Sequence, residues 1–188
     1  MVCEIRVIHK AATCTGDTTF QNHNIVPGVL LLNITVMLKI GDRMPYFEVQ
    51  DQDGNTVNSG ELLGRKTIIY FYPKDNTSGC TAEACNLRDN YEALIAKGYN
   101  VIGVSKDSVK SHKNFKEKHS LPFTLLADTA TDMIKSFGVW GEKTLYGRKY
   151  MGIERSTFVL DENLNIINEW RKVKVKGHVD EVIEYLNA

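Results

Sequence analysis

The sequence predicts one α/β domain, with a mixed central sheet flanked by helices. Runs of β-branched and apolar residues alternate, from Met37 onward, with segments in which apolar residues recur at helical spacing. This alternation is typical of a sheet whose strands are connected through helices. The length of 188 residues, 43% of them hydrophobic, suits a single core.

Six apolar or β-branched runs predict strands, over residues 46–49, 67–72, 100–105, 123–127, 156–160 and 166–170. Turns are expected at Asp53-Gly54 and Glu162-Asn163. Helical spacing predicts helices over residues 80–97, 108–118, 129–137 and 178–187. Gly98 is expected to end the first of these helices.

Residues 1–36 show no sustained periodicity of either kind, whereas domain-like sequence begins abruptly at Met37. We therefore expect a poorly ordered N-terminal extension over 1–36 and the folded domain over 37–188. No chemistry is assigned to the extension.

Composition excludes several classes of function. The chain has 23 basic and 23 acidic residues, so it lacks the surplus of positive charge that nucleic-acid binding needs. No apolar run approaches the ~20 residues of a membrane-spanning helix, and the N-terminus does not resemble a signal peptide. Four cysteines are too few for a disulfide-stapled secreted scaffold. We expect reactive thiols in a reducing compartment, the cytoplasm.

Cys80 follows a predicted buried strand and a loop, and it falls in the first turn of the predicted helix 80–97. Unpaired backbone N–H groups and the helix dipole favour an anion at that position, and a thiolate is such an anion. Because the thiolate is the nucleophile, the position predicts a reactive cysteine. The structural alternative is a small buried hydrophobe, as most free cysteines are.

Cys85 lies five residues after Cys80, and such a pair could bind a metal, form a redox couple or be coincidental. No second cysteine pair follows for zinc or for an iron–sulfur cluster. A redox couple therefore remains, with thiol–disulfide exchange as an open alternative. Five helical residues give a rise of ~7.5 Å and a rotation of ~140°. An intact helix thus forbids an 80–85 disulfide, and its first turns must unwind for the bond to form.

The spacing Pro73-x-x-x-Thr77-x-x-Cys80 resembles the active-site motif of peroxiredoxins. The match extends over roughly 37–188 and resembles the bacterioferritin comigratory protein branch, also called peroxiredoxin Q. It includes residues 71–75, Cys85 with Arg88-Asp89, residues 137–143 and residues 155–161. The resemblance implies a thioredoxin-like fold and reduction of hydrogen peroxide and organic hydroperoxides. It also implies electrons from thioredoxin or a similar dithiol, with no metal, flavin or haem.

By position, the resemblance makes Cys80 the peroxidatic cysteine and Cys85 the resolving cysteine. Thr77 corresponds to the hydroxyl that orients thiolate and peroxide, and Pro73 to the ring that shields the pocket. Arg155 corresponds to the active-site arginine. From the residues alone, Thr77 could be only a helix N-cap, and Arg155 could be only a surface ion pair.

Glu83 and Arg88 are predicted to be solvated charges on the helix surface and are left out of the catalytic set. At Ser78 the family often has proline, so the catalytic turn is expected to open more easily here.

Two other functions remain as alternatives. One is a peroxide sensor that passes oxidation to a partner protein, and the other is a non-catalytic binding module. We expect a monomer or a weak dimer.

Overall fold

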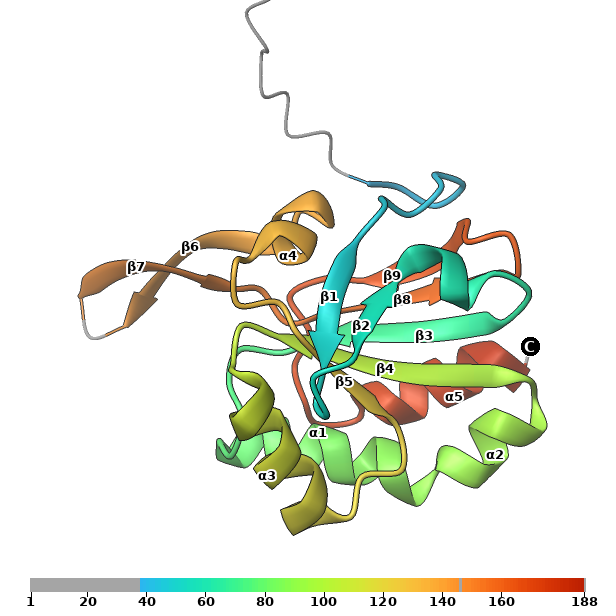
Figure 1. Cartoon of the computed structure of the whole chain (residues 1–188), viewed down its shortest axis with the longest axis horizontal. Helices are drawn as coiled ribbons and strands as arrows, with labels where there is room; N and C mark the ends of the chain where they lie inside the picture. Colours follow the sequence, from blue (N-terminus) through green and yellow to red (C-terminus); the bar gives the residue numbers. More distant parts are fainter. Residues whose placement is uncertain (1–37, 146, 188) are drawn as a thin grey trace, which may run out of the picture. The chain divides into compact units, whose positions relative to one another are not determined.

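The computed structural model describes residues 38–145 and 147–187, and the predictions for residues 1–36 lie outside them. A seven-stranded mixed sheet has the strand order β2-β1-β5-β4-β3-β8-β9 (Figure 1). Its strands are β1 (Glu48–Asp51), β2 (Thr56–Asn58), β3 (Lys66–Phe71), β4 (Tyr99–Ser105), β5 (Thr124–Ala127), β8 (Ser156–Leu160) and β9 (Ile166–Trp170). β3, β4 and β5 run parallel, and the remaining pairs are antiparallel. The predicted mixed sheet is confirmed.

Helices cover both faces of this sheet. One face carries α1 (Ser78–Asp89), α2 (Tyr91–Ala96), α3 (Val109–His119) and α5 (His178–Asn187), which Figure 1 shows below the strands. The other face carries α4 (Asp132–Ser136) and the 3-10 helix η1 (Ser59–Leu62). The sheet therefore separates two hydrophobic cores.

The side chains of β3 alternate between the two cores. Ile68 and Tyr70 pack with the α1 side, whereas Ile69 and Phe71 pack with the α4 side. All four are at most 1% exposed. A strand buried on both faces needs an unbroken apolar run, which is why this segment was recognisable in the sequence. Burying Ile68, Ile69 and Phe71 contributes about 1.5–3 kcal/mol each.

Strand ends differ from the prediction where long-range pairing decides them. β8 and β9 have the predicted bounds, β4 and β5 differ by one residue at one end, and β3 begins and ends one residue earlier than predicted. β1 lies two residues later than predicted, because the backbone of Gln50 and Asp51 pairs with Ala127 and Leu126 of β5. The short strand β2 was not predicted.

The single helix predicted over 80–97 is wrong. The chain forms α1 and α2 with a break at Asn90, whose φ of −104° and ψ of 5° are not helical. The Asn90 side chain donates to the carbonyl of Asn86 at 2.9 Å, so it competes with the backbone for helical hydrogen bonds. α5 has the predicted bounds and α3 is shifted by one residue, whereas α4 is shorter than predicted.

A β-hairpin formed by β6 (Trp140–Leu145) and β7 (Arg148–Ile153) was also missed. It forms a separate two-stranded sheet that extends away from the main sheet (Figure 1). Its sequence mixes glycine, lysine and polar residues, so it lacks the apolar run that marks the central strands. Tyr150 and Met151 on this hairpin are 46% and 49% exposed.

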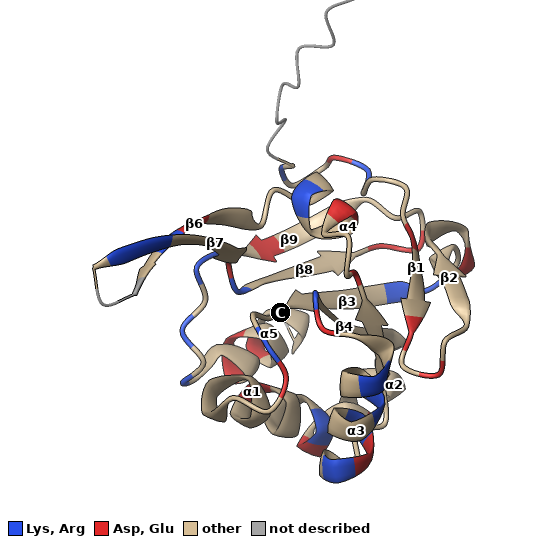
Figure 2. Cartoon of the chain, turned by 60° about the vertical axis from the view of Figure 1, so that its left-hand side comes forward, with Lys and Arg blue, Asp and Glu red and all other residues tan. Residues whose placement is uncertain are grey.

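Basic and acidic residues are interspersed over the described part of the chain (Figure 2), which agrees with a formal net charge of zero. Among the helices that the structure describes, none has the length and hydrophobicity required to cross a membrane.

Candidate active site

Cys80 lies where the carboxyl end of β3 leads, through a short loop, into α1. Because α1 begins at Ser78, Cys80 occupies its first turn, as predicted. The side chain is 2% exposed and its thiol is free. Cys80 is therefore a buried nucleophile candidate at the positive end of a helix.

Arg155 contacts this cysteine directly. Its Nη2 donates to the Sγ of Cys80 at 3.1 Å. Arg155 immediately precedes β8, and the pairing of β8 with β3 places Ser156 beside Phe71 at the end of β3. Antiparallel pairing thus brings together two residues that are 75 positions apart in the sequence. The geometry contradicts the reading of Arg155 as only a surface ion pair.

Glu83 is the second partner of Arg155, whose Nη1 donates to Glu83 Oε2. The prediction that Glu83 is a solvated surface charge is wrong, since it is 1% exposed. Its other oxygen, Oε1, has no hydrogen-bond partner among the described residues. Sequence spacing held a usable signal, because residues three apart share a helix face and Glu83 is three residues after Cys80.

Burial and charge act in opposite directions on this pair. Burial raises the pKa of Glu83 to about 7, although the nearby Arg155 guanidinium opposes the rise. Burial alone would lower the pKa of Arg155, but Glu83 and Cys80 more than offset that effect and raise it. Arg155 therefore keeps its positive charge beside Cys80 throughout the physiological pH range, while Glu83 titrates within it.

Thr77 and Pro73 frame the loop before Cys80. Thr77 occupies the N-cap position of α1 with an extended backbone, but its side chain makes no capping hydrogen bond. Instead, Thr77 Oγ1 donates to the carbonyl of Lys74 at 3.2 Å, which leaves its lone pairs available. Pro73 is half-buried. The Thr77 hydroxyl therefore does not cap the helix, so a role as N-cap does not explain the hydrogen bond that it makes.

Aromatic residues form the floor beneath Cys80, and the sequence analysis did not single them out. Tyr70 and Tyr72 belong to the same buried cluster as Cys80, and their rings stack with centroids 5.3 Å apart. Burial raises the pKa of Tyr70 well above its usual value, and its hydroxyl has no partner among the described residues. Gly103 on β4 makes room for this ring, because a Cβ there would lie 2.7 Å from the Tyr70 hydroxyl. The thiol thus belongs to a buried cluster that includes two stacked aromatic rings.

Cys85 lies further along the intact helix α1, half-buried and free. No disulfide joins it to Cys80 in this state, as the helical geometry requires. Arg88 lies one turn beyond Cys85, and its Nη1 donates to the carbonyl of His119 on α3 at 2.8 Å. The prediction of Arg88 as a solvated surface charge is therefore only partly right, since its side chain is 34% exposed.

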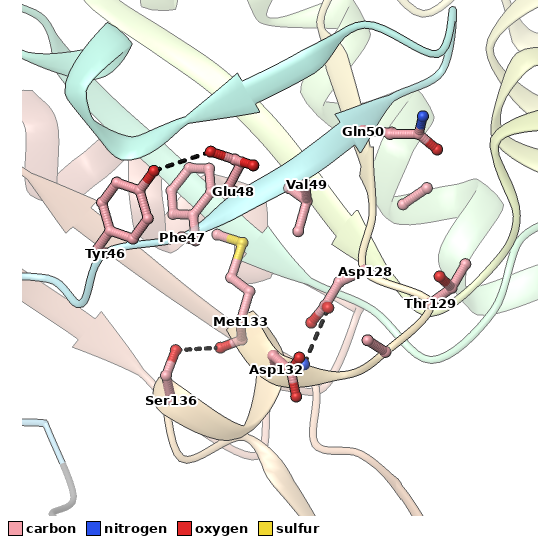
Figure 3. Close-up of a pocket in the computed structure, with 12 residues that line it drawn as sticks. Tyr46, Phe47, Glu48, Val49, Gln50, Asp128, Thr129, Asp132, Met133 and Ser136 are labelled. Atoms are coloured by element: carbon pink, nitrogen blue, oxygen red, sulfur yellow. Dashed lines mark hydrogen bonds between the residues drawn. The ribbon is translucent and has the colours of Figure 1, made fainter. Parts of the chain in front are cut away.

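A separate pocket of about 430 Å³ lies between β1, the end of β5 and α4 (Figure 3). Its charged lining is Glu48, Asp128 and Asp132, and none of the predicted site residues lines it. The Asp128 carboxylate accepts backbone hydrogen bonds from Asp132 at 3.0 Å and Ile134 at 2.7 Å, so it is occupied in holding α4. The residues that line this pocket are distant in the sequence from Cys80 and Cys85, and neither cysteine is among them.

Comparison with known proteins identifies the family of this chain. The sequence model of the AhpC/TSA family matches residues 40–169. Peroxiredoxin Bcp of Bacillus subtilis is 47% identical over 149 residues, which cover 79% of this chain and 95% of that protein. Peroxiredoxin Bcp of Escherichia coli is 42% identical over 149 residues, with 79% and 96% covered.

Solved structures give the same result. Peroxiredoxin Q of Xylella fastidiosa, as a cysteine-to-serine mutant, superposes with a TM-score of 0.76 at 34% identity, covering 80% of this chain and 96% of that one. The bacterioferritin comigratory protein of Xanthomonas campestris, for which alkyl peroxide reduction activity is described, gives a TM-score of 0.71 at 38% identity, with 75% and 90% covered. The fold is thus thioredoxin-like, as predicted. The chain belongs to the AhpC/TSA family and, within it, to the peroxiredoxins of the Bcp, or peroxiredoxin Q, branch.

Proposed function

We propose that this protein is a thiol peroxidase in which Cys80 reduces hydrogen peroxide and organic hydroperoxides. The observation that carries the proposal is the hydrogen bond from Arg155 Nη2 to Cys80 Sγ at 3.1 Å. In the first step, the Cys80 thiolate attacks one peroxide oxygen and the O–O bond breaks. The departing oxygen takes up a proton and leaves as alcohol or water, and Cys80 becomes a sulfenic acid.

Arg155 supports this step in two ways. Its guanidinium favours the thiolate over the thiol, and it cannot be deprotonated at neutral pH. As the O–O bond breaks, negative charge grows on the departing oxygen, and a donor already fixed at the sulfur stabilises that charge without reorganisation. The backbone N–H groups of the first turn of α1 are additional donors. Glu83 holds the other arm of the guanidinium and thereby orients it.

Thr77 and Pro73 complete the proposed catalytic set. The Thr77 hydroxyl donates to a backbone carbonyl and keeps acceptor capacity toward the peroxide. Pro73 has no N–H and a fixed φ, so it stiffens the loop between β3 and Thr77. Both residues lie in the six-residue loop that connects the end of β3 to α1.

In the second step, we propose that the Cys85 thiol condenses with the Cys80 sulfenic acid, which forms a disulfide and releases water. The intact α1 keeps these sulfurs apart, so its first turns must unwind. The sequence lowers the free-energy cost of this unwinding, because Gly79, Thr81 and Asn86 are poor helix formers. The buried face of α1 is also modest and includes the small side chain of Ala84.

In the third step, a dithiol reductant exchanges with the 80–85 disulfide and restores both thiols. We propose thioredoxin or a similar dithiol in this role, with the protein acting in the cytoplasm as a monomer or weak dimer. The step needs no metal, flavin or haem, because two thiols supply both electrons.

Peroxide consumption in the presence of thioredoxin, thioredoxin reductase and NADPH tests the proposal. The samples are wild type, Cys80→Ser and Cys85→Ser, with a mass-spectrometric disulfide map of the oxidised wild type. We expect Cys80→Ser to be inactive and the map to show an 80–85 bond. An active Cys80→Ser enzyme would overturn the proposal. Full recycling by Cys85→Ser would retain the peroxidase and assign the resolving thiol elsewhere.

A further inference from the structure

The proposed disulfide requires residues around Cys80 and Cys85 to rearrange while the sheet beneath them stays folded. Two contacts outside the catalytic set lie on either side of this segment. One involves Asp75, upstream of Cys80, and the other involves Arg88, downstream of Cys85. Both contacts are made to the same helix, α3.

The upstream contact is a buried polar network centred on the Asp75 carboxylate. It accepts from Ser111 Oγ at 2.7 Å, from His112 Nδ1 at 2.9 Å and from Tyr72 Oη at 2.8 Å. Asp75 is 4% exposed and His112 is fully buried. Burial alone would raise the pKa of Asp75, but the hydrogen bonds and charge of His112 outweigh it, so the pKa is lowered. This end of the catalytic loop is thus fixed to the start of α3.

The ring of His112 extends the network into the sheet. Its Nε2 lies 3.1 Å from the carbonyl of Leu126 on β5. His112 therefore joins Asp75 to β5 through its two ring nitrogens. A buried pair in which every polar atom is bonded is costly to open.

The downstream contact is the hydrogen bond from Arg88 Nη1 to the carbonyl of His119 at 2.8 Å. His119 is the last residue of α3, so its carbonyl lacks a helical partner. Arg88 also contacts the Asp89 carboxylate at 2.8 Å, but both of those side chains are substantially exposed. The bond to His119 thus connects the end of α1 to α3.

α3 itself is well fixed. Phe115, in its middle, is fully buried, and its ring lies 6.2 Å from that of Tyr72. The twelve residues 76–87 lie between the two contacts and include both cysteines. From this arrangement we propose that Asp75 and Arg88 are positioning residues that hold both ends of the rearranging segment on α3. Unwinding then stops at these two contacts, and residues 76–87 refold between fixed ends after each reduction.

This inference rests on the proposed function, because disulfide formation is the proposed reason for the rearrangement. Amide hydrogen exchange tests the positioning roles in both the reduced and the oxidised protein. In oxidised wild type with a verified 80–85 bond, we expect faster exchange across residues 76–87. Residues 70–75 and α2 are expected to keep the protection they have in the reduced protein. In the reduced protein, the same twelve residues are expected to open as one unit, independently of any disulfide.

Arg88→Ala is the main variant, because its side chain is partly exposed and its loss leaves the core intact. We expect exchange in α2 to become about tenfold faster in both redox states, the effect of losing one charged hydrogen bond. Asp89→Ala is the matched control, since it removes the exposed partner of Arg88 and leaves the His119 contact in place. It is expected to leave the exchange boundary unchanged.

Ser111→Ala tests the upstream end without removing the buried charge, and is expected to speed exchange in residues 72–75. The inference is overturned if exchange in oxidised wild type spreads evenly through α2 or back into β3. It is also overturned if Arg88→Ala has the same exchange pattern as wild type, or if Asp89→Ala speeds exchange in α2 as much as Arg88→Ala does. If the 80–85 bond does not form, the proposed resolving step fails, while the exchange boundary in the reduced protein still decides the positioning roles.

Discussion

Arg155→Lys is the most informative single change at the site, because it keeps the positive charge and removes the two directed hydrogen bonds of the guanidinium. Arg155 donates from Nη2 to Cys80 and from Nη1 to Glu83, and one ammonium cannot reproduce both directed bonds. The side chain of Arg155 is only 12% exposed, so solvent screens the lost interaction little. The expected loss therefore corresponds to a full hydrogen bond between charged groups.

Such a bond contributes about 1.5–3 kcal/mol. Because it acts on the thiolate and on the developing oxyanion, the second-order rate constant for peroxide is expected to fall about 10- to 150-fold. Stopped-flow measurement of the first oxidation, before any recycling, isolates this step from disulfide formation and from the reductant.

Arg171→Lys is the matched control for this experiment. Arg171 is also largely buried and multiply bonded, to Glu169 and to the carbonyls of Phe137, Gly138 and Leu38. It has no contact with Cys80, so its substitution should lower stability and leave the oxidation rate within about threefold of wild type. An Arg155→Lys rate constant as high as that of the control would refute the role given to the guanidinium.

Three further predictions concern pH and loop opening. Glu83 has a pKa of about 7, above its value of 4.5 in the unfolded chain, so the folded state binds the proton more tightly. The free energy of unfolding should thus fall by about 3 kcal/mol as pH rises from 4.5 to 7, and urea titrations of Glu83→Gln should lack this component. His178 acts in the opposite direction: burial, together with Arg155, lowers its pKa to about 4. Protonation of His178 therefore lowers the free energy of unfolding by about 3 kcal/mol as pH falls from 6.5 to 4, and His178→Asn should remove that loss. The same dependence of unfolding free energy on pH in wild type and variant would contradict this prediction. Ser78 is the first residue of α1, where proline fits, so Ser78→Pro should slow disulfide closure after oxidation, and an unchanged or faster rate in rapid-quench mass spectrometry would contradict this reasoning.

Local sequence was sufficient to predict the elements whose bounds depend on residues close together in the chain. The bounds of β8, β9 and α5 could be predicted because unbroken apolar runs and helical spacing are visible within a few residues. Cys80 could be placed in the first turn of a helix because the end of β3, the loop and the start of α1 are consecutive. The hairpin β6–β7 and the break at Asn90 carry no comparable signal.

Other features depended on contacts between distant parts of the chain. Helical spacing places Glu83 on the same face as Cys80, but its burial depends on another element that covers this face and supplies Arg155 as a partner. The connection between Asp75 and His112 likewise joins residues 37 positions apart, through packing of α3 against the loop.

The sequence by itself determined the α/β class, the position of Cys80 in the first turn of a helix and the spacing that prevents an 80–85 disulfide in an intact helix. Each of these follows from backbone geometry and side-chain chemistry within a short window. Only the tertiary structure decided which charges surround the thiol and which contacts hold the segment around it. Strand pairing and helix packing bring those groups together, and their energies depend on burial that no local window contains.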